Sequence, residues 1–292
     1  MENPNFSKVR IAYFSGTGST SRVATAFERE LAGRGVSVLM SEIRAGFPLS
    51  EDNEDLLLLL FPVHAFNAPE IVYNWIDRTL YEKSISAAVI SVSGGGELSP
   101  NTACRLNSIH RLEKKGYSVV YEKMLVMPSN CFVKTDDRLA IRLLRVLPSK
   151  VKCITDDLMR GVVHRTTPKF IDRVFSRVGE FEKRGAKAFG ENIQVNNNCN
   201  ACGWCKRSCP ANNISMLNNR PMFGVECLLC LKCIYGCPNK ALEAGTLKFT
   251  ILKEGYDLNA LEKRMEGVEL APVEDLAKSY LWKGVKKYLL ED

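Results

Sequence analysis

The chain has 292 residues, 46% hydrophobic and 25% charged, a balance that excludes disordered and fibrous proteins. At roughly 150 residues per domain, this length predicts about two domains. The net charge of +7 is spread without a basic block, which argues against nucleic-acid binding. The longest apolar stretch, 56–63, is far shorter than the roughly 20 residues of a membrane span. The N-terminal residues lack a signal-peptide pattern, so we expect a cytoplasmic protein.

The first 130 residues alternate between short apolar runs and helical patterns. The expected strands cover 9–15, 36–40, 56–61, 87–93 and 117–126. The expected helices cover 20–33, 70–80 and 101–115. Residues 56–61 are apolar at every position, as in a parallel strand that is covered on both faces. This alternation predicts an α/β fold with a doubly wound parallel sheet.

The rest of the chain reads as helical, apart from a cysteine-rich segment. We expect a helical stretch over 136–163 interrupted at Pro148, a β-like stretch over 247–252, and helices near 257–266 and 272–290. A helix over 169–189 has an apolar face that should be buried, formed by Phe170, Val174, Phe175, Val178 and Phe181. The predicted units are a first domain 1–165, a helical connector 166–192, a cysteine domain 193–245 and a helical C-terminal extension 246–292.

Eight of the eleven cysteines lie within residues 199–237, which in a reducing compartment indicates metal ligation rather than disulfides. They form two runs with the spacing C-x2-C-x2-C-x3-C-P, starting at Cys199 and again 28 residues later at Cys227. Structural zinc sites use paired C-x2-C knuckles and give no reason for two such runs. The spacing is that of bacterial two-cluster ferredoxins and predicts two [4Fe-4S] clusters.

Residues 193–245 resemble the dicluster ferredoxins, in which the fourth cysteine of each run ligates the other cluster. The resemblance implies one cluster on Cys199, Cys202, Cys205 and Cys237, and a second on Cys227, Cys230, Cys233 and Cys209. Free dicluster ferredoxins are typically acidic. Here, between residues 196 and 242, one acidic residue, Glu226, stands against five cations: Lys206, Arg207, Arg220, Lys232 and Lys240. These cations either only solvate the surface or steer a partner.

A loop rich in glycine and hydroxyl groups follows the first expected strand and precedes the first expected helix. It consists of Ser15, Gly16, Thr17, Gly18, Ser19 and Thr20. No lysine follows the glycines, and Ser21 occupies the third glycine position of a dinucleotide fingerprint, so neither of those phosphate loops matches. The loop fits the (S/T)-x-T-G-x-T pattern of flavodoxins, in which amides and hydroxyls hold a phosphate without a cation. A plain structural turn remains the alternative.

Two more loops follow the third and fourth expected strands. The first contains Pro62, Val63, His64, Ala65, Phe66 and Asn67, and the second contains Ser93, Gly94, Gly95, Gly96 and Glu97. Residues 1–165 therefore resemble a flavodoxin, whose sheet order 2-1-3-4-5 brings such loops to one edge, and the resemblance implies bound FMN. The second loop has no aromatic residue, so we expect one face of the flavin ring to be accessible to a substrate or to the iron–sulfur domain.

Taken together, the chain resembles the flavodoxin–ferredoxin fusion proteins of anaerobic bacteria and archaea. This resemblance implies an electron-transfer iron–sulfur flavoprotein that passes low-potential electrons between two [4Fe-4S] clusters and FMN, with no catalytic residue of its own. It would exchange electrons with a redox partner protein or a small acceptor, and whether two copies form a homodimer is left open. The first alternative is an FMN-dependent reductase of a small, flat, quinone-like substrate. The second is a non-catalytic module that has lost FMN, against which the intact hydroxyl loop argues.

Overall fold

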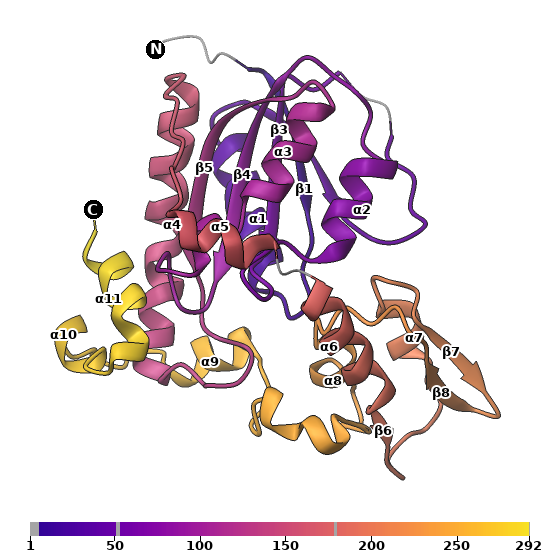
Figure 1. The fold of residues 1–292 in the computed structure, drawn as a ribbon. Coiled ribbons are helices and arrows are strands. Elements are labelled where there is room, and N and C mark those ends of the chain that lie inside the picture. The colour runs from indigo at the N-terminus through magenta and orange to yellow at the C-terminus, as the bar shows by residue number, and fades with distance from the viewer. Residues whose placement is uncertain (1–5, 51–52, 178–179, 292) are drawn as a thin grey trace.

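The computed structural model describes residues 6–50, 53–177 and 180–291, and its central feature is a parallel β-sheet (Figure 1). The five strands are β1 (Lys8–Tyr13), β2 (Ser37–Glu42), β3 (Leu56–Pro62), β4 (Ser86–Ser93) and β5 (Ser118–Val126). They lie in the order β2-β1-β3-β4-β5, and every neighbouring pair is parallel. This is the flavodoxin-like doubly wound arrangement, so the predicted fold class and strand order are confirmed.

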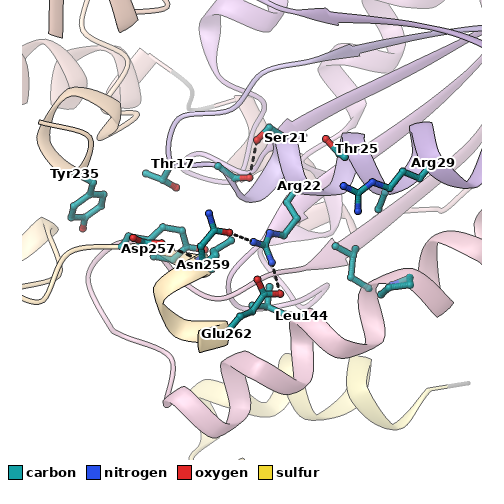
Figure 2. A pocket seen from close by; sticks show the side chains of 16 residues that line it. Thr17, Ser21, Arg22, Thr25, Arg29, Leu144, Tyr235, Asp257, Asn259 and Glu262 are labelled. Carbon is teal, nitrogen blue, oxygen red and sulfur yellow. Dashed lines mark hydrogen bonds and ion pairs between the residues drawn. The ribbon is translucent and has the colours of Figure 1, made fainter. Parts of the chain in front are cut away.

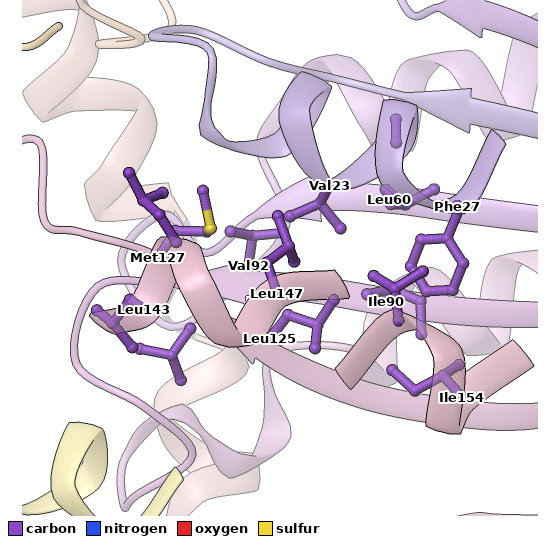
Figure 3. Close-up of a cluster of buried hydrophobic side chains, with 14 of the residues drawn as sticks. Val23, Phe27, Leu60, Ile90, Val92, Leu125, Met127, Leu143, Leu147 and Ile154 are labelled. Atoms are coloured by element: carbon purple, nitrogen blue, oxygen red, sulfur yellow. The ribbon is translucent and has the colours of Figure 1, made fainter. Parts of the chain in front are cut away.

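The apolar strand β3 lies at the centre of two hydrophobic layers, because successive side chains of a strand point to opposite faces. Leu58 and Leu60 pack with Val23 and Phe27 of helix α1, and the same layer includes helix α4 (Figure 3). Leu57, Leu59 and Phe61 lie in the other layer. The helices are α1 (Ser19–Ala32) and α4 (Asp137–Met159) on one face, and α2 (Glu70–Arg78) and α3 (Leu106–Lys114), preceded by the 3-10 turn η1 (Asn101–Ala103), on the other.

Helix α4 is continuous through Pro148, so the predicted interruption there is wrong. Proline removes one backbone donor, and such helices persist when packing supports both halves. Leu144 and Leu147 before the proline and Val151 after it are buried in the layer against α1. The helix ends at Met159, four residues before the expected end.

The connector differs most from the prediction. Its described residues form helix α5 (Phe170–Arg177) and helix α6 (Glu180–Glu191), and the residues between them lie outside the described part of the chain. Phe170 and Val174, expected to be buried, are 82% and 46% exposed. The buried face is polar instead, because Asp172 accepts hydrogen bonds from Ser99 (2.5 Å) and Thr102. The side chains of Phe175 and Phe181, and all of Val178, lie outside the described residues.

The cysteine segment is built from short elements that share a small apolar core. These are β6 (Gln194–Val195), α7 (Trp204–Ser208), β7 (Ile214–Leu217), β8 (Arg220–Phe223), α8 (Lys232–Tyr235) and β9 (Leu242–Glu243). Strands β6 and β9 pair antiparallel, as do β7 and β8. The core contains Phe189 of α6 together with Ile214 and Ile234. This α+β segment lies beyond one end of the parallel sheet (Figure 1).

The C-terminal extension is helical but more broken than predicted. The β-like stretch expected at 247–252 is instead a 3-10 helix, η2 (Gly245–Thr250). Helix α9 (Leu258–Arg264) matches the expectation, whereas the long helix expected at 272–290 is divided into α10 (Val273–Leu276), η3 (Tyr280–Trp282) and α11 (Lys283–Leu290). Its apolar residues pack beside α4. No helix in the described part of the chain is long and apolar enough to cross a membrane.

A buried charge network ties β4 and β5 to the loop after β4. Arg105 is fully buried and donates to Glu122 (2.8 Å) and to Ser91 (2.9 Å), and it also pairs with Glu97. Burial by itself raises the pKa of the Glu122 carboxyl, but the Arg105 guanidinium, the Thr166 amide and Arg165 together outweigh it and keep that pKa below its usual range. Glu97 therefore anchors its loop to the sheet.

Replacing Arg105 with methionine should lower the free energy of unfolding by about 3 kcal/mol, because Glu122 would stay buried without its main partner. Urea denaturation measures this loss. The matched control is Arg111→Met, which breaks a half-exposed pair with Asp77 and should cost about 1 kcal/mol or less. The free energies of unfolding of wild type and Arg105→Met should become more similar as the pH falls through the lowered pKa of Glu122. The reason is that the ion pair stabilises the fold only while Glu122 is ionised. Equal losses for both variants would contradict this assignment.

Candidate cofactor sites

The hydroxyl loop joins β1 to the N-terminus of α1, where the first helical N–H groups have no partner within the helix. Two features fix its shape. Gly18 has a φ of 101°, a value that glycine adopts far more readily than other residues, and the Gly18 amide donates a hydrogen bond to Ser15 Oγ (3.2 Å). Thr17 accepts from Asn130 Nδ2 (2.7 Å), and Ser19 shares a hydrogen bond with the hydroxyl of Tyr256 (2.6 Å). Thr20 is buried in the first turn. The loop is thus a cluster of polar groups at a helix N-terminus, the arrangement that binds phosphates.

The loop after β3 forms a tight two-residue turn. His64 and Asn67 exchange both backbone hydrogen bonds (2.8 Å each), and Ala65 and Phe66 between them have φ values of 41° and 69°. Positive φ at both central residues of a non-glycine turn is costly, and such strain concentrates at functional sites. The turn places Ala65 and Phe66 on the wall of a pocket, whereas Asn67 is buried and bonded to Tyr73 and Asn107.

Only the first residues of the loop after β4 contact this pocket. Ser93 and Gly94 line it. A Cβ on Gly96 would overlap the backbone of Gly284 in α11, which packs directly against this loop. Gly95, Gly96 and Glu97 are not among the lining residues, and Glu97 is bound to Arg105. The aromatic-free end of this loop is therefore covered by the C-terminal extension.

The pocket between these loops is apolar and has a volume of about 550 Å³. On the sheet side it is lined by Ser19, Pro62, Val63, His64, Ala65, Phe66, Val92, Ser93, Gly94 and residues 127–132. On the other side it is lined by Gly185 and Ala186 of α6, by Leu229 and Leu231 of the second cysteine run, and by Leu247, Phe249 and Thr250 of η2. The size and the mostly apolar wall suit a flat aromatic ligand with few polar groups.

A second, polar pocket of about 670 Å³ lies along α1 beside the hydroxyl loop (Figure 2). Thr17, Gly18 and Ser21 line its end nearest the loop. Arg22 extends across it to Glu262 (2.6 Å) and Asn259 (2.5 Å) of α9, as the dashed lines in Figure 2 show. The hydroxyl loop therefore stands between a polar and an apolar pocket, because Thr17 lines the first and Ser19 the second.

The eight motif cysteines surround two separate cavities. Cys199, Cys202, Cys205 and Cys237 line the first, and Cys209, Cys227, Cys230 and Cys233 line the second. The fourth cysteine of each run thus stands with the first three of the other. In the described part of the chain, no three His, Cys, Asp or Glu side chains are grouped to hold one metal ion. The cysteines therefore enclose these cavities without forming a single-ion site.

The two cysteine loops have the same backbone shape, 28 residues apart. Ala201 and Leu229 are equivalent positions with φ of 59° and 50°, and Gly203 and Leu231 are equivalent positions with φ of 68° and 60°. Left-handed residues between cysteines turn successive N–H groups toward one point, which favours a bound anion. The amide of Asn213 donates to Cys209 Sγ (3.4 Å), and at the equivalent position the amide of Ala241 donates to Cys237 Sγ (3.3 Å). Such N–H···S bonds stabilise thiolates and bound iron–sulfur clusters.

The second cavity is the more deeply buried of the two. Burial raises the pKa of the Cys230 thiol to about 12 and that of Cys233 well above its ordinary value, and neighbouring cysteines add to the second shift. Without a metal these thiols would be protonated at neutral pH. By contrast, Cys202 of the first cavity is exposed.

The cysteine segment sits directly on the loop edge of the sheet. A Cβ on Gly16 of the hydroxyl loop would overlap the carbonyl oxygen of Cys230. Around this point, Lys232 pairs with Glu42 (2.6 Å) and Tyr235 donates to the carbonyl of Asn130 (2.8 Å). One backbone hydrogen bond, from the Ala45 amide to the carbonyl of Pro210 (2.8 Å), extends the same contact. Gly16 is therefore a packing contact between the two units.

Several site residues were missed by the sequence analysis. Asn130 and its neighbours follow the C-terminal end of β5, and strand ends at this edge are where ligands bind, so this position offered a signal. Tyr256 and Phe249 come from the extension, and nothing in their sequence spacing points to the hydroxyl loop or the pocket. Gly185 and Ala186 lay within the helix predicted as a connector.

Known structures similar to this chain cover about half of it. A flavodoxin from Archaea is 14% identical, with a TM-score of 0.37 over 52% of this chain and 98% of its own. General stress protein 14 from Treponema denticola, solved with FMN, is 14% identical, with a TM-score of 0.35 over 52% and 96%. A putative quinone reductase from Klebsiella pneumoniae is 16% identical, with a TM-score of 0.39 over 53% and 86%. The strand order and directions, rather than this similarity, define the fold. No protein-family model matches the sequence, and no curated protein matches it either.

Replacing Gly16 with alanine should loosen the contact between the hydroxyl loop and Cys230, because both sides of that contact are backbone. We expect faster amide hydrogen exchange at residues 228–235 and 13–20, and a lower unfolding temperature. Gly95→Ala is the matched control, since nothing lies within 4 Å of its added methyl group. If the amide hydrogens of Gly16→Ala exchange at the wild-type rate in both segments, the two units do not pack as described.

Proposed function

We propose that this chain is an electron-transfer iron–sulfur flavoprotein that passes low-potential electrons between two [4Fe-4S] clusters and FMN, in exchange with a redox partner in the cytoplasm. The observation that carries the proposal is the shared wall of two sites. Leu229 and Leu231, which flank Cys230, line the apolar pocket, and Leu231 also lines the cavity of the second cysteine set. A ligand in the pocket would be separated from that cavity by little more than one side chain.

FMN fits the combination of polar loop and apolar pocket. Its phosphate would bind at the N-terminus of α1, with Thr17, Ser19, Asn130 and Tyr256 as the polar groups nearest to it. Its ring would lie in the apolar pocket against Phe66 and Gly94. In this assignment eight of the predicted loop residues lie on the pocket wall, whereas Gly16, Asn67 and Glu97 have structural roles. When bound, FMN can take up one or two electrons, whereas each cluster passes one at a time.

Two [4Fe-4S] clusters fit the two cysteine cavities. Each cavity offers four thiols, a pair of left-handed backbone positions and an N–H···S bond at its fourth cysteine. Both cavities show these features at equivalent residues, which supports two cofactors of one kind. The protein holds the thiolates in place, donates hydrogen bonds to them and, at the second cavity, keeps water away.

A reductase of a small, flat, quinone-like substrate is the second candidate. Phe132 and Phe249 stand at the rim of the apolar pocket, 59% and 66% exposed, with ring centroids 6.3 Å apart. Exposed aromatic side chains at the mouth of a pocket can stack on a flat substrate. The same rings could instead contact a partner protein. Either a small acceptor or a partner protein at this rim is compatible with the proposed electron transfer.

Converting Asn130 to aspartate should weaken FMN binding at least tenfold, because it places a carboxylate beside the phosphate while keeping the side-chain shape. Riboflavin, which lacks the phosphate, is the matched ligand control and should bind the variant as it binds wild type. Flavin fluorescence titration of the flavin-free protein measures both affinities. Parallel losses for both flavins would show that this loop does not hold the phosphate.

Cys209→Ala should remove the cluster of the second cysteine set while leaving that of the first, although Cys209 belongs to the first run in sequence. Iron content should fall by about half, and electron paramagnetic resonance of the reduced protein should lose one of two coupled centres. Cys153→Ala, at an exposed cysteine outside both runs, is the control and should change neither. Loss of the centre on Cys199, Cys202 and Cys205 instead would overturn the crossed assignment.

A further inference from the structure

The two cysteine cavities occupy unequal positions. The second shares Leu231 with the apolar pocket, whereas the first has no lining residue in common with that pocket. All residues that line the first cavity lie between 199 and 242, so nothing from the parallel sheet reaches it. In Figure 1, the hairpin of β7 and β8 projects from the cysteine segment on the side away from α4. Exposed Cys202 belongs to this outer cavity.

Four exposed cations lie within two positions in sequence of residues that line the outer cavity, and we call them the outer basic face: Lys206, Arg207, Arg220 and Lys240. Lys206 and Arg207 stand on α7 directly after the lining residue Cys205, Arg220 precedes the lining residue Pro221, and Lys240 follows the lining residue Asn239.

The charge of this face is not neutralised by neighbouring side chains. Arg207 donates to the carbonyl of Cys202 (2.9 Å) and Arg220 donates to the carbonyl of Val195 (3.1 Å). These contacts hold the guanidinium groups in place but do not neutralise their charge, because a carbonyl group is uncharged. None of the four forms an ion pair with a described residue, and Lys248 already pairs with the nearby Glu243 (3.2 Å). Lys232, the fifth cation of the segment, faces the sheet and is bound to Glu42. With an oxidised cluster contributing formally about −2, the four cations leave the face at about +2.

We propose that the outer basic face is the docking surface for an acidic one-electron carrier protein, and that the outer cluster is where electrons enter the chain. The inference rests on the proposed function, because it assigns an order to the cofactors proposed above. In each encounter the reduced carrier would lose one electron to a cluster held by Cys199, Cys202, Cys205 and Cys237 of the outer cavity. The electron would continue through the cavity of the second cysteine set, which shares Leu231 with the apolar pocket, to a flavin in that pocket, and two such encounters with protons from solvent would reduce the flavin fully. Opposite charge steers such encounters and raises their rate most at low ionic strength.

The test uses the full chain with its cofactors and, as the probe, a free acidic dicluster ferredoxin that has been photoreduced without oxygen. Stopped-flow absorption follows bleaching of this protein's flavin. For wild type, the second-order rate constant should fall steeply as the salt concentration rises. The variant Lys206→Glu with Lys240→Glu should react at least tenfold more slowly at low salt and should lose most of this salt dependence.

The matched control is Lys263→Glu with Lys278→Glu, an equal charge change at exposed lysines of the C-terminal extension, which should react like wild type. A small photoreductant should reduce all three proteins equally, which shows that the cofactors of the variants are intact. Equal slowing of both variants, or no slowing of the Lys206→Glu, Lys240→Glu protein, would overturn the docking surface. A wild-type protein that carries no iron or flavin would overturn the proposed function itself, and its absorption spectrum shows this before any kinetics.

Discussion

The close backbone contact between Gly16 and Cys230 is the constraint on which the rest of the structure depends. A side chain at position 16 would separate the hydroxyl loop from the second cysteine run, so this contact requires glycine for packing. It sets the apolar pocket between the sheet edge and the cysteine segment, with walls from both. The ion pair of Lys232 with Glu42 and the bond from Tyr235 to Asn130 hold the contact on either side. The two units therefore form one site.

The C-terminal extension contributes residues to this site and to the packing of its loops. Tyr256 reaches Ser19 of the hydroxyl loop, and Gly284 of α11 packs against the loop that follows β4. Burial raises the pKa of the Tyr256 hydroxyl above its ordinary value, so it remains a neutral hydrogen-bonding group beside the hydroxyl loop. The connector contributes in a different way, because Asp172 fastens α5 to the sheet domain through Ser99 and Thr102 while Gly185 and Ala186 of α6 line the pocket.

The parts of this architecture that follow local chemistry could be predicted from sequence. Six consecutive apolar residues in β3 required cover on both faces, and the cysteine spacing, with its 28-residue repeat, indicated two equivalent loops. The parts that depend on which segment covers another could not. The periodicity at Phe170 and Val174 predicted a buried apolar face, yet hydrogen bonds to buried Asp172 turned the helix the other way. Likewise, Gly94 and Gly96 look alike in sequence, but only Gly94 reaches the pocket because α11 covers Gly96.

The central claim is that flavin and clusters communicate inside one assembly. Stopped-flow reduction of the clusters, with the flavin bleaching followed at several protein concentrations, tests this most directly. Because the pocket wall and the inner cavity share Leu231, flavin reduction should follow cluster reduction at a rate that does not depend on protein concentration. A rate that rises linearly with concentration, or a flavin that stays oxidised while the clusters are reduced, would contradict this account.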